Sequence, residues 1–529
     1  MKTAQTTVRQ TTGRIGGLIC FLAVVLFAAA LKFYPAFQGF LLSFQEYTPL
    51  YGMTNSPWVG TQNYDQLLNG PYFYSILKNS FVLGFLANLI PIAVGFLLGW
   101  PLAKFSGGKT AGLFLGIWLL PVFLPAQMYT LIAGWFGGVE LLGHPSSSVL
   151  VYMGAAGIRT LCFSVFLCGI CGYLCKRSGA SSTKGSLLGG GVLLMISAIN
   201  LLTPSLEILH GIQNPLNYEA TDTLDTYAYR TGLMNASFSP SAAAWCVKLL
   251  LELPFFLLAV IVFLRLFKNI PFRREPASIQ ESTSLPGIFS LIAVGLFSVF
   301  AMVVFISLFP GSSPDFTRYA LNGAVTAIFT AVLFFGFLLL FGYGSASRPA
   351  AGIALGGFLI WISCNTVGEY LFYRQAGAIN TLWPVILNGV FLTPLLIPFL
   401  VIGALIFQAH PCRGFGDWIH RMLPFLLLFT GLSMANAWGS SEASVIYISD
   451  NAQYGLSILL RNAFLLVGNT DAVAPLGTPE NIGLTGACAV FCIVPFCIGV
   501  LSVILFTITD LRSSDHAADL RSADRAALR

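Results

Sequence analysis

The sequence predicts an all-α, polytopic membrane protein with about 12 transmembrane helices. Of its 529 residues, 56% are apolar and only 9% are charged, against roughly 25% charged residues in a soluble domain. The apolar residues gather in about a dozen stretches, and a membrane helix needs about 20 such residues in a row. The connecting segments differ in their content of Lys and Arg, as expected of loops on opposite sides of a membrane.

The apolar stretches form two sets of six. Between the sets lies 268–284, a polar mid-chain stretch that we interpret as a cytoplasmic linker. The sequence therefore predicts a first membrane domain over 1–267 and a second over 285–529, the second ending in a short cytoplasmic tail. The expected helices cover 15–34, 76–104, 111–135, 148–174, 185–202 and 242–266, then 285–308, 319–341, 350–370, 382–407, 422–438 and 485–508.

The basic residues indicate the orientation. Of the 27 Lys and Arg, 19 fall in segments that the alternation of helices places on one side. Because basic residues resist translocation, this side is expected to be cytoplasmic. Both chain ends would then be cytoplasmic, in a plasma or inner membrane. A cleaved signal peptide is the alternative for the first stretch, which pairs basic residues with an apolar core and Ala28-Ala29-Ala30.

No metal, cofactor or catalytic site is expected. Most of the 11 Cys lie in apolar runs, where Cys behaves as a small apolar residue. The CxxC of Cys168 and Cys171 lacks a second pair and a nearby His. The patterns GxxxxGK[ST], HExxH and GxSxG are absent. The formal charge of +6 is spread over short loops, which argues against a nucleic-acid partner. The sequence thus favours transport over catalysis.

Two segments of the first half carry a family resemblance. YPAFQGFLLSFQEYTPL (34–50) and SPWVGTQNYDQLLNGPYFYSILKNSF (56–81) resemble the start of maltose-type ABC importer permeases. The shared features are a Tyr-Pro, a Leu-Ser-Phe, a Val-Gly, an Asn-aromatic pair and a Lys-Asn-Ser. NPLNYEATDTLDTYAYRTGLMNASFSPSAAA (214–244) is similar to the oligosaccharide and polygalacturonan subgroup of that family.

The second half resembles the partner permease of the same systems. GAINTLWPVIL (377–387) is similar to its Gly-x-x-Asn-Thr-x-Trp segment, and SMANAWGSSEASVIYISDNAQYGLSILLRN (433–462) to its aromatic-rich turn and outer helix. Such permeases are normally two polypeptides. Here they resemble two subunits fused in tandem at the linker.

The resemblance implies the permease component of a binding-protein-dependent importer in a bacterial cell membrane. It implies alternating access, a carbohydrate substrate (an oligosaccharide), and a solute-binding protein that docks on the longer outer loops 46–75, 207–241 and 439–484. A separate ATPase subunit would bind the ATP. Two other functions stay open: a secondary transporter with two six-helix repeats, and a non-transporting scaffold derived from a permease.

Four residues are candidates for the substrate pathway. Lys248 and Glu252 are four residues apart on one face of the expected sixth helix, and charges inside a membrane are costly enough to suggest a function. A self-neutralising structural pair is the alternative. Asn436 and Trp438 end the expected eleventh helix, where an aromatic face beside an amide suits a sugar; helix-end anchoring is the alternative.

Two cytoplasmic slots are candidates for contact with the ATPase. The family has a Glu-Ala-Ala loop there that forms a short coupling helix, and both slots of this chain lack that core. The slots 175–184 and 410–421 are basic, and Trp418 is expected to make the dominant contact. The candidate residues are Lys176, Arg177 and Lys184 in the first slot, and Arg413, Gly416, Asp417, Trp418 and Arg421 in the second.

Overall fold

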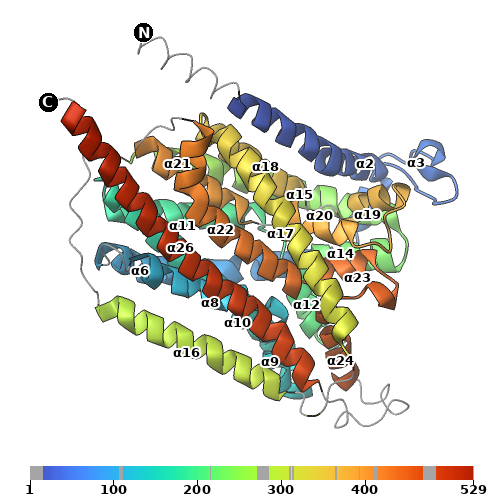
Figure 1. Ribbon diagram of the computed structural model, residues 1–529. Coiled ribbons are helices and arrows are strands. Elements are labelled where there is room, and N and C mark those ends of the chain that lie inside the picture. Colours follow the sequence, from blue (N-terminus) through green and yellow to red (C-terminus); the bar gives the residue numbers. More distant parts are fainter. Residues whose placement is uncertain are drawn as a thin grey trace.

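The computed structural model is a bundle of long helices (Figure 1). It describes residues 16–105, 111–214, 216–270, 285–308, 311, 315–363, 366–391, 394–409, 414–468 and 484–527. Most of the expected linker therefore lies outside the described residues, and the division into two domains stays a prediction. Among the described residues, the one β contact is a bridge between Gln45 and Trp58.

The first half contains long helices joined by short outer ones. The helix that starts near Gly16 continues through η1 (Ala29–Phe33) and α2 (Tyr34–Leu42). It is followed by α3 (Gly52–Asn55), α4 (Gln62–Leu68), α5 (Phe73–Phe81), η2 (Val82–Leu86), α6 (Ala87–Phe105), α7 (Ala111–Gly116), η4 (Ile117–Leu119), α8 (Leu120–Phe123), α9 (Ala126–Gly143), α10 (Pro145–Arg177), α11 (Ser182–Ile199), α12 (Leu206–Ile212), α13 (Tyr218–Thr221), α14 (Leu224–Tyr229), η5 (Arg230–Met234) and α15 (Phe238–Lys268).

The second half repeats this alternation of long and short helices. Its elements are α16 (Leu285–Ser307), α17 (Thr317–Ser345), α18 (Pro349–Ile362), α19 (Thr366–Gln375), α20 (Trp383–Phe391), α21 (Leu396–Ala409), α22 (Phe415–Gly439), α23 (Glu442–Tyr447), η6 (Asn451–Gln453), α24 (Leu456–Gly468) and α26 (Thr485–Ala527).

Within the described residues, nine helices are long and apolar enough to cross a membrane. Two further pairs, α7–α8 with α9 and α18 with α19, bend by more than 40° at a short break, which raises the count to 11 if each pair is one span. All twelve expected stretches are thus helical, but three of them are not continuous. The third stretch of each set is a bent pair, and the expected helix 382–407 is divided into α20 and α21.

Proline explains the best-defined of these breaks. A residue before Pro is driven out of the helical region by contact with the proline ring. Leu124, which precedes Pro125, has an extended backbone with ψ 141° and ends α8, and α9 begins directly after the proline. Pro394 also lies between two helices, α20 and α21. The count of apolar residues alone could not show these interruptions.

The two halves share one apolar core. The largest buried cluster joins Leu115, Phe123 and Phe166 of the first half to Phe341 and Phe429 of the second. A second cluster joins α9 and α12 to α24 and α26 in the same way. Side chains on either side of the expected boundary at 268–284 therefore pack into common layers.

Glycine allows three helices of the first half to approach closely. A Cβ on Gly99 of α6 would lie 2.6 Å from the carbonyl oxygen of Val165 on α10, and one on Gly185 of α11 would lie 2.5 Å from that of Cys171. Small residues four apart let helix backbones meet in a membrane. The Gly-rich run 185–191 of α11 is therefore a surface that packs closely on α10.

We expect Gly189→Leu to destabilise the protein, because its Cβ would lie 2.8 Å from the backbone of Leu167 and Cys168. Overpacking of this kind costs about 3 kcal/mol. The matched control is Gly154→Leu on α10, where nothing lies within 4 Å of the new Cβ. Thermal unfolding in detergent should separate the two variants. Equal unfolding temperatures would contradict the close packing of α10 and α11.

The short helices gather at one end of the bundle. Figure 1 places α3, α14, α19 and α23 together at the end away from the start of the first helix and the end of α26. These short helices of the expected outer segments thus lie opposite the two described chain ends. Which end of the bundle faces the cytoplasm stays a prediction.

Candidate functional site

Charged side chains of α14 and α15 are buried where the halves meet. Lys248 and Glu252 of α15 are each 1% exposed. Lys248 Nζ lies 2.5 Å from Asp225 Oδ1 of α14, and Glu252 Oε1 accepts hydrogen bonds from the Leu202 backbone N–H at 2.9 Å and the Thr203 hydroxyl at 3.3 Å. The two candidates are thus buried on one face as expected, and each also has a partner outside α15.

An arginine bridges the two halves. Arg159 Nη2 of α10 donates to Asn436 Oδ1 of α22 at 2.6 Å and to the Val122 carbonyl oxygen at 2.9 Å. Glu207 of α12 attracts the same guanidinium. The sequence interpretation did not include Arg159 among the pathway candidates, although an Arg inside an apolar stretch is a signal that could have found it.

A second buried ion pair joins the first helix to the second half. Lys32 Nζ lies 2.7 Å from Glu369 Oε1 of α19 and donates to Asn388 Oδ1 of α20 at 3.2 Å. The side chains are 1% and 5% exposed. Asn388 also forms a side-chain hydrogen bond with Tyr447 of α23. Sequence reasoning missed this pair, since Lys32 was read as part of the first apolar stretch.

These groups form one interfacial polar cluster. Glu442 of α23 interacts electrostatically with Glu207, Asp225 and Lys248, and Tyr447 connects Glu442 to Glu369. We define the cluster by its ten residues, which come from both halves. They are Lys32, Arg159, Glu207, Asp225, Lys248, Glu252, Glu369, Asn388, Asn436 and Glu442.

Burial changes the protonation of the acids on the short outer helices. It raises the pKa of Glu207 to about 7, which the Arg159 charge and a hydrogen bond from the Ser441 backbone oppose. Burial also raises the pKa of Glu442 to about 7, and the neighbouring Glu207 carboxylate adds to this rise. Burial lowers the pKa of His210 to about 4. At neutral pH the imidazole is therefore uncharged, and the cluster's permanent cations are Lys and Arg.

The other two pathway candidates differ in their surroundings. Asn436 belongs to the interfacial polar cluster through Arg159. Trp438 is 5% exposed, donates from Nε1 to the Phe491 carbonyl oxygen at 3.1 Å, and packs on Gly323. Its ring faces are covered by α17 and α26, so Trp438 offers no open face to a sugar, and the anchoring alternative fits it better.

The first coupling slot is a tight turn. Helix α10 ends at Arg177 and α11 begins at Ser182, and the four residues between them, all described, form no helix. Lys176 Nζ donates to the Lys104 carbonyl oxygen at 2.8 Å, Arg177 is partly exposed and Lys184 is exposed. The basic groups are therefore at the surface, on the tip of a helical hairpin.

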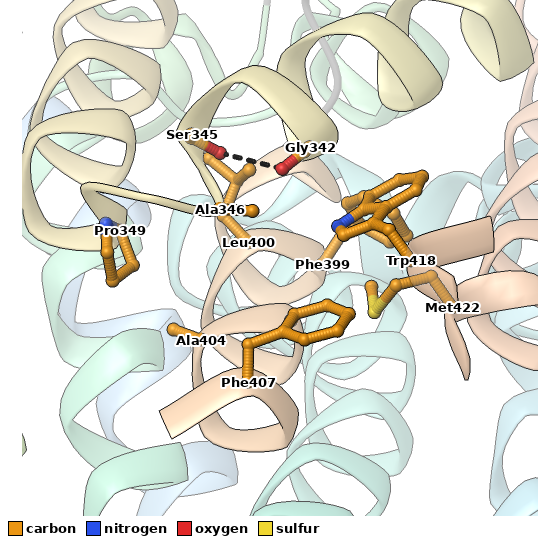
Figure 2. Close-up of a pocket in the computed structure, with 11 residues that line it drawn as sticks. Gly342, Ser345, Ala346, Pro349, Phe399, Leu400, Ala404, Phe407, Trp418 and Met422 are labelled. Carbon is orange, nitrogen blue, oxygen red and sulfur yellow. Dashed lines mark hydrogen bonds between the residues drawn. The ribbon is translucent and has the colours of Figure 1, made fainter. Parts of the chain in front are cut away.

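The described part of the second coupling slot starts at Gly414 and continues into α22. Gly416 is exposed and Asp417 forms an ion pair with Arg421 at 2.8 Å, while Arg413 lies outside the described residues. Trp418, which we expected to contact a partner, is only 1% exposed; its role in coupling stays a prediction. Figure 2 shows Trp418 beside a cavity of about 10 Å³ with Phe399, Phe407 and Met422 around it. That volume suits at most one water molecule.

Trp418 is buried because a glycine of α17 leaves space for its indole ring. A Cβ on Gly342 would lie 2.7 Å from the indole, so the glycine leaves room for the ring. Tyr343 and Phe399 contact the indole edge to face, with ring centres 6.0 and 6.5 Å away. The segment around Trp418 reads as a polar loop, in which an aromatic side chain is expected to be exposed. Its burial depends on Phe399 and Tyr343, which lie about 20 and 75 positions earlier in the sequence.

Part of the chain is similar to a curated protein. No family model matches the chain. The chain is 27% identical over 249 residues to the polygalacturonan/rhamnogalacturonan transport system permease protein YteP of Bacillus subtilis (strain 168), a match that covers 41% of this chain and 77% of the relative.

Two solved structures were also found. One is a bacterial ABC transporter involved in the import of the acidic polysaccharide alginate, with a TM-score of 0.38, 19% identity, and coverage of 46% of this chain and 93% of that one. The other is the bacterial alginate ABC transporter in complex with an alginate pentasaccharide-bound periplasmic protein, with a TM-score of 0.34, 19% identity, and coverage of 40% and 85%. The chain is an all-α, multi-pass membrane protein that resembles the permease subunits of sugar-importing ABC transporters.

Proposed function

We propose that this chain is the transmembrane permease of a binding-protein-dependent ABC importer for oligosaccharides, and that the interfacial polar cluster lines its substrate pathway. The observation that carries the proposal is the composition of the cluster. Its charged and amide groups are contributed by both halves and meet inside an otherwise apolar bundle. Groups placed between two halves can be exposed to either side when the halves rock against each other.

The partners follow from the same proposal. A soluble binding protein would deliver the sugar to the end that carries α3, α14 and α23, and an ATPase would dock at the opposite end. The exposed contacts available there are Arg177 and Lys184 on the α10–α11 turn and Gly416 at the start of α22. The chain would thus supply the pathway and no catalysis, with ATP bound by a separate ATPase subunit.

Reconstitution tests the proposal. The purified chain, an ATPase subunit and a binding protein from the same organism should together import a labelled oligosaccharide into vesicles when ATP is present. Uptake that persists without ATPase but requires an ion gradient would favour secondary transport instead.

A permease-derived scaffold is the second candidate, and the four-residue turn between α10 and α11 is the observation that favours it. Such a turn has no short helix to enter an ATPase cleft. Failure of the folded chain to bind any ATPase subunit in co-purification would support the scaffold and count against import.

We expect Asn235→Cys to react with a membrane-impermeant thiol reagent in intact cells, and Lys184→Cys to react only after permeabilisation. Both positions are exposed: Asn235 directly follows η5, and Lys184 lies in the first turn of α11. Most described native cysteines are buried or partly buried and should react slowly. Labelling of Lys184→Cys from outside would reverse the orientation inferred from the basic loops.

A further inference from the structure

A groove with a volume of about 330 Å³ lies between α17 and the start of α20. Its apolar walls are formed by Val325 and Phe329 of α17 and by Leu382, Trp383 and Ile386 at the start of α20. Ligand pockets usually measure about 300–1,000 Å³, so the groove suits one chain of a ligand and not a large molecule. Its lining residues are separate from the interfacial polar cluster.

The apolar walls of the groove belong to the surface that faces the membrane. Helix α17 is a candidate membrane span, and its exposed side chains from Leu321 to Leu340, which include Val325 and Phe329, are all apolar. The exposed Trp383 lies beside them, and Trp is typical of the level at which lipid headgroups meet the acyl chains. The molecules that contact such a surface in a membrane are lipids, so the groove is open to an acyl chain.

Hydrogen-bond donors lie at the end of the groove near the start of α17. The amide side chains of Asn380 and Gln453 line this end. Asn380 Oδ1 accepts from the backbone N–H and the hydroxyl of Ser449 at 2.7 and 2.8 Å, so its amide nitrogen is the group that can donate to a ligand. Asn322 Nδ2 donates to the Ala452 carbonyl oxygen at 2.8 Å, which holds η6 against α17 and fixes the position of Gln453.

Arg318 supplies a positive charge at the same end. It is exposed and lies seven residues before Val325, about two turns along the same face of α17. Its Nη2 donates to the Asn451 carbonyl oxygen of η6 at 3.5 Å, which uses one of the five N–H donors of a guanidinium. The nearby Asp315 carboxylate accepts a hydrogen bond from the Thr317 backbone N–H at 3.0 Å. The remaining donors of Arg318 match a phosphate, which Arg can bind through two parallel hydrogen bonds.

We propose that this groove binds one phospholipid, with the phosphate on Arg318 and one acyl chain between Phe329 and Trp383. The acceptor oxygens and the apolar chains of a phospholipid follow each other in the same order as the donors and the apolar walls of the groove. An acyl chain gains little by leaving the bilayer for the groove, because lipid tails are as apolar as its walls. Selective binding must therefore come from the headgroup, where hydrogen bonds between Arg and phosphate are stronger than neutral ones.

Native mass spectrometry of the purified full-length chain in detergent tests the proposal. The probes are phosphatidylglycerol and a diacylglycerol with the same chains, which lacks the phosphate. We expect one phosphatidylglycerol to bind at least about tenfold more tightly than the diacylglycerol, the effect of one hydrogen bond to a charged group. Arg318→Gln should lower the affinity for phosphatidylglycerol about tenfold and leave that for the diacylglycerol unchanged.

Exposed positions provide matched variants and controls. Val325→Trp fills the groove and should remove the tight site, whereas Ile328→Trp places the same ring on an exposed part of α17 outside the groove and should preserve it. Lys78→Gln removes an exposed cation of α5 and should leave the binding of phosphatidylglycerol unchanged. Because all of these side chains are exposed, the variants are expected to fold.

Four results would overturn the proposal. The first is equal affinity of the wild-type chain for the two lipids, and the second is tight binding that persists in both Arg318→Gln and Val325→Trp. Displacement of the lipid by maltotriose would assign the groove to a sugar instead. A dimer of the wild-type chain that is absent from Val325→Trp would assign the groove to a second copy. The proposed import function does not depend on any of these results.

Discussion

Replacing Lys32 with Met should destabilise the folded protein by about 3–5 kcal/mol, the usual cost of leaving one member of a buried ion pair without its partner. Lys32 and Glu369 are 2.7 Å apart, with side chains 1% and 5% exposed. The lone Glu369 would have to bind a proton or draw in water, and the bond from Lys32 to Asn388 would also be lost. The measurement is thermal or denaturant unfolding of the purified protein in detergent.

The double variant Lys32→Met/Glu369→Leu distinguishes this explanation from a simple loss of packing. Because it removes both charges together, its stability should return to near that of the wild type. Lys184→Met, which removes an exposed Lys, should have no measurable effect. A double variant less stable than either single variant would show that the pair contributes through shape and not through charge.

Arg159→Met should reduce sugar uptake by about tenfold or more while the amount of folded protein stays close to normal. A hydrogen bond to a charged group contributes about 1.5–3 kcal/mol, and the bond from Arg159 to Asn436 joins the two halves. If transport alternates between arrangements that make and break this bond, its loss shifts their ratio by about 10- to 150-fold. Uptake into vesicles and sugar-stimulated ATP hydrolysis are the measurements.

Two further variants refine this expectation. Arg159→Lys keeps the charge but lacks the planar guanidinium group with its several N–H donors, so it should restore only part of the uptake. Arg374→Met removes an exposed Arg of α19 and is the control. Normal uptake by Arg159→Met would show that the contact between α10 and α22 is static and that the pathway lies elsewhere.

The positions of the helices were predictable because apolar length is a local property of the sequence. The buried state of Lys248 and Glu252 was also predictable, since both lie inside a long apolar helix. The partner Asp225 was not, because it lies in an outer segment whose short helices fold back against α15. A charged residue in an outer loop is normally expected to be exposed to solvent. The sequence around Asp225 does not indicate that its helix packs against α15.

The burial of the two aromatic candidates, Trp418 and Trp438, was not predictable either. Trp418 was a candidate because it lies in the second cytoplasmic slot. Trp438 was a candidate because it ends an expected helix, where Trp often marks the membrane boundary. In the structure each is surrounded by helices distant in sequence, α17 and α21 for Trp418, α17 and α26 for Trp438. Burial of this kind depends on which glycine faces the ring, Gly342 in one case and Gly323 in the other. A single sequence does not reveal such pairings.

The tight turn between α10 and α11 also determines which helices would move if an ATPase docked there. Helices α10 and α11 are joined by four residues and pack closely through glycine, so they are expected to move as one rigid body. A displacement of the turn would therefore also displace Arg159, which lies on α10. The second slot instead leads into α22, which ends beside Asn436. Arg159 would thus be moved by a pair of packed helices and Asn436 by a single helix. An ATPase dimer with two identical docking sites would therefore act unequally on the two halves of this chain.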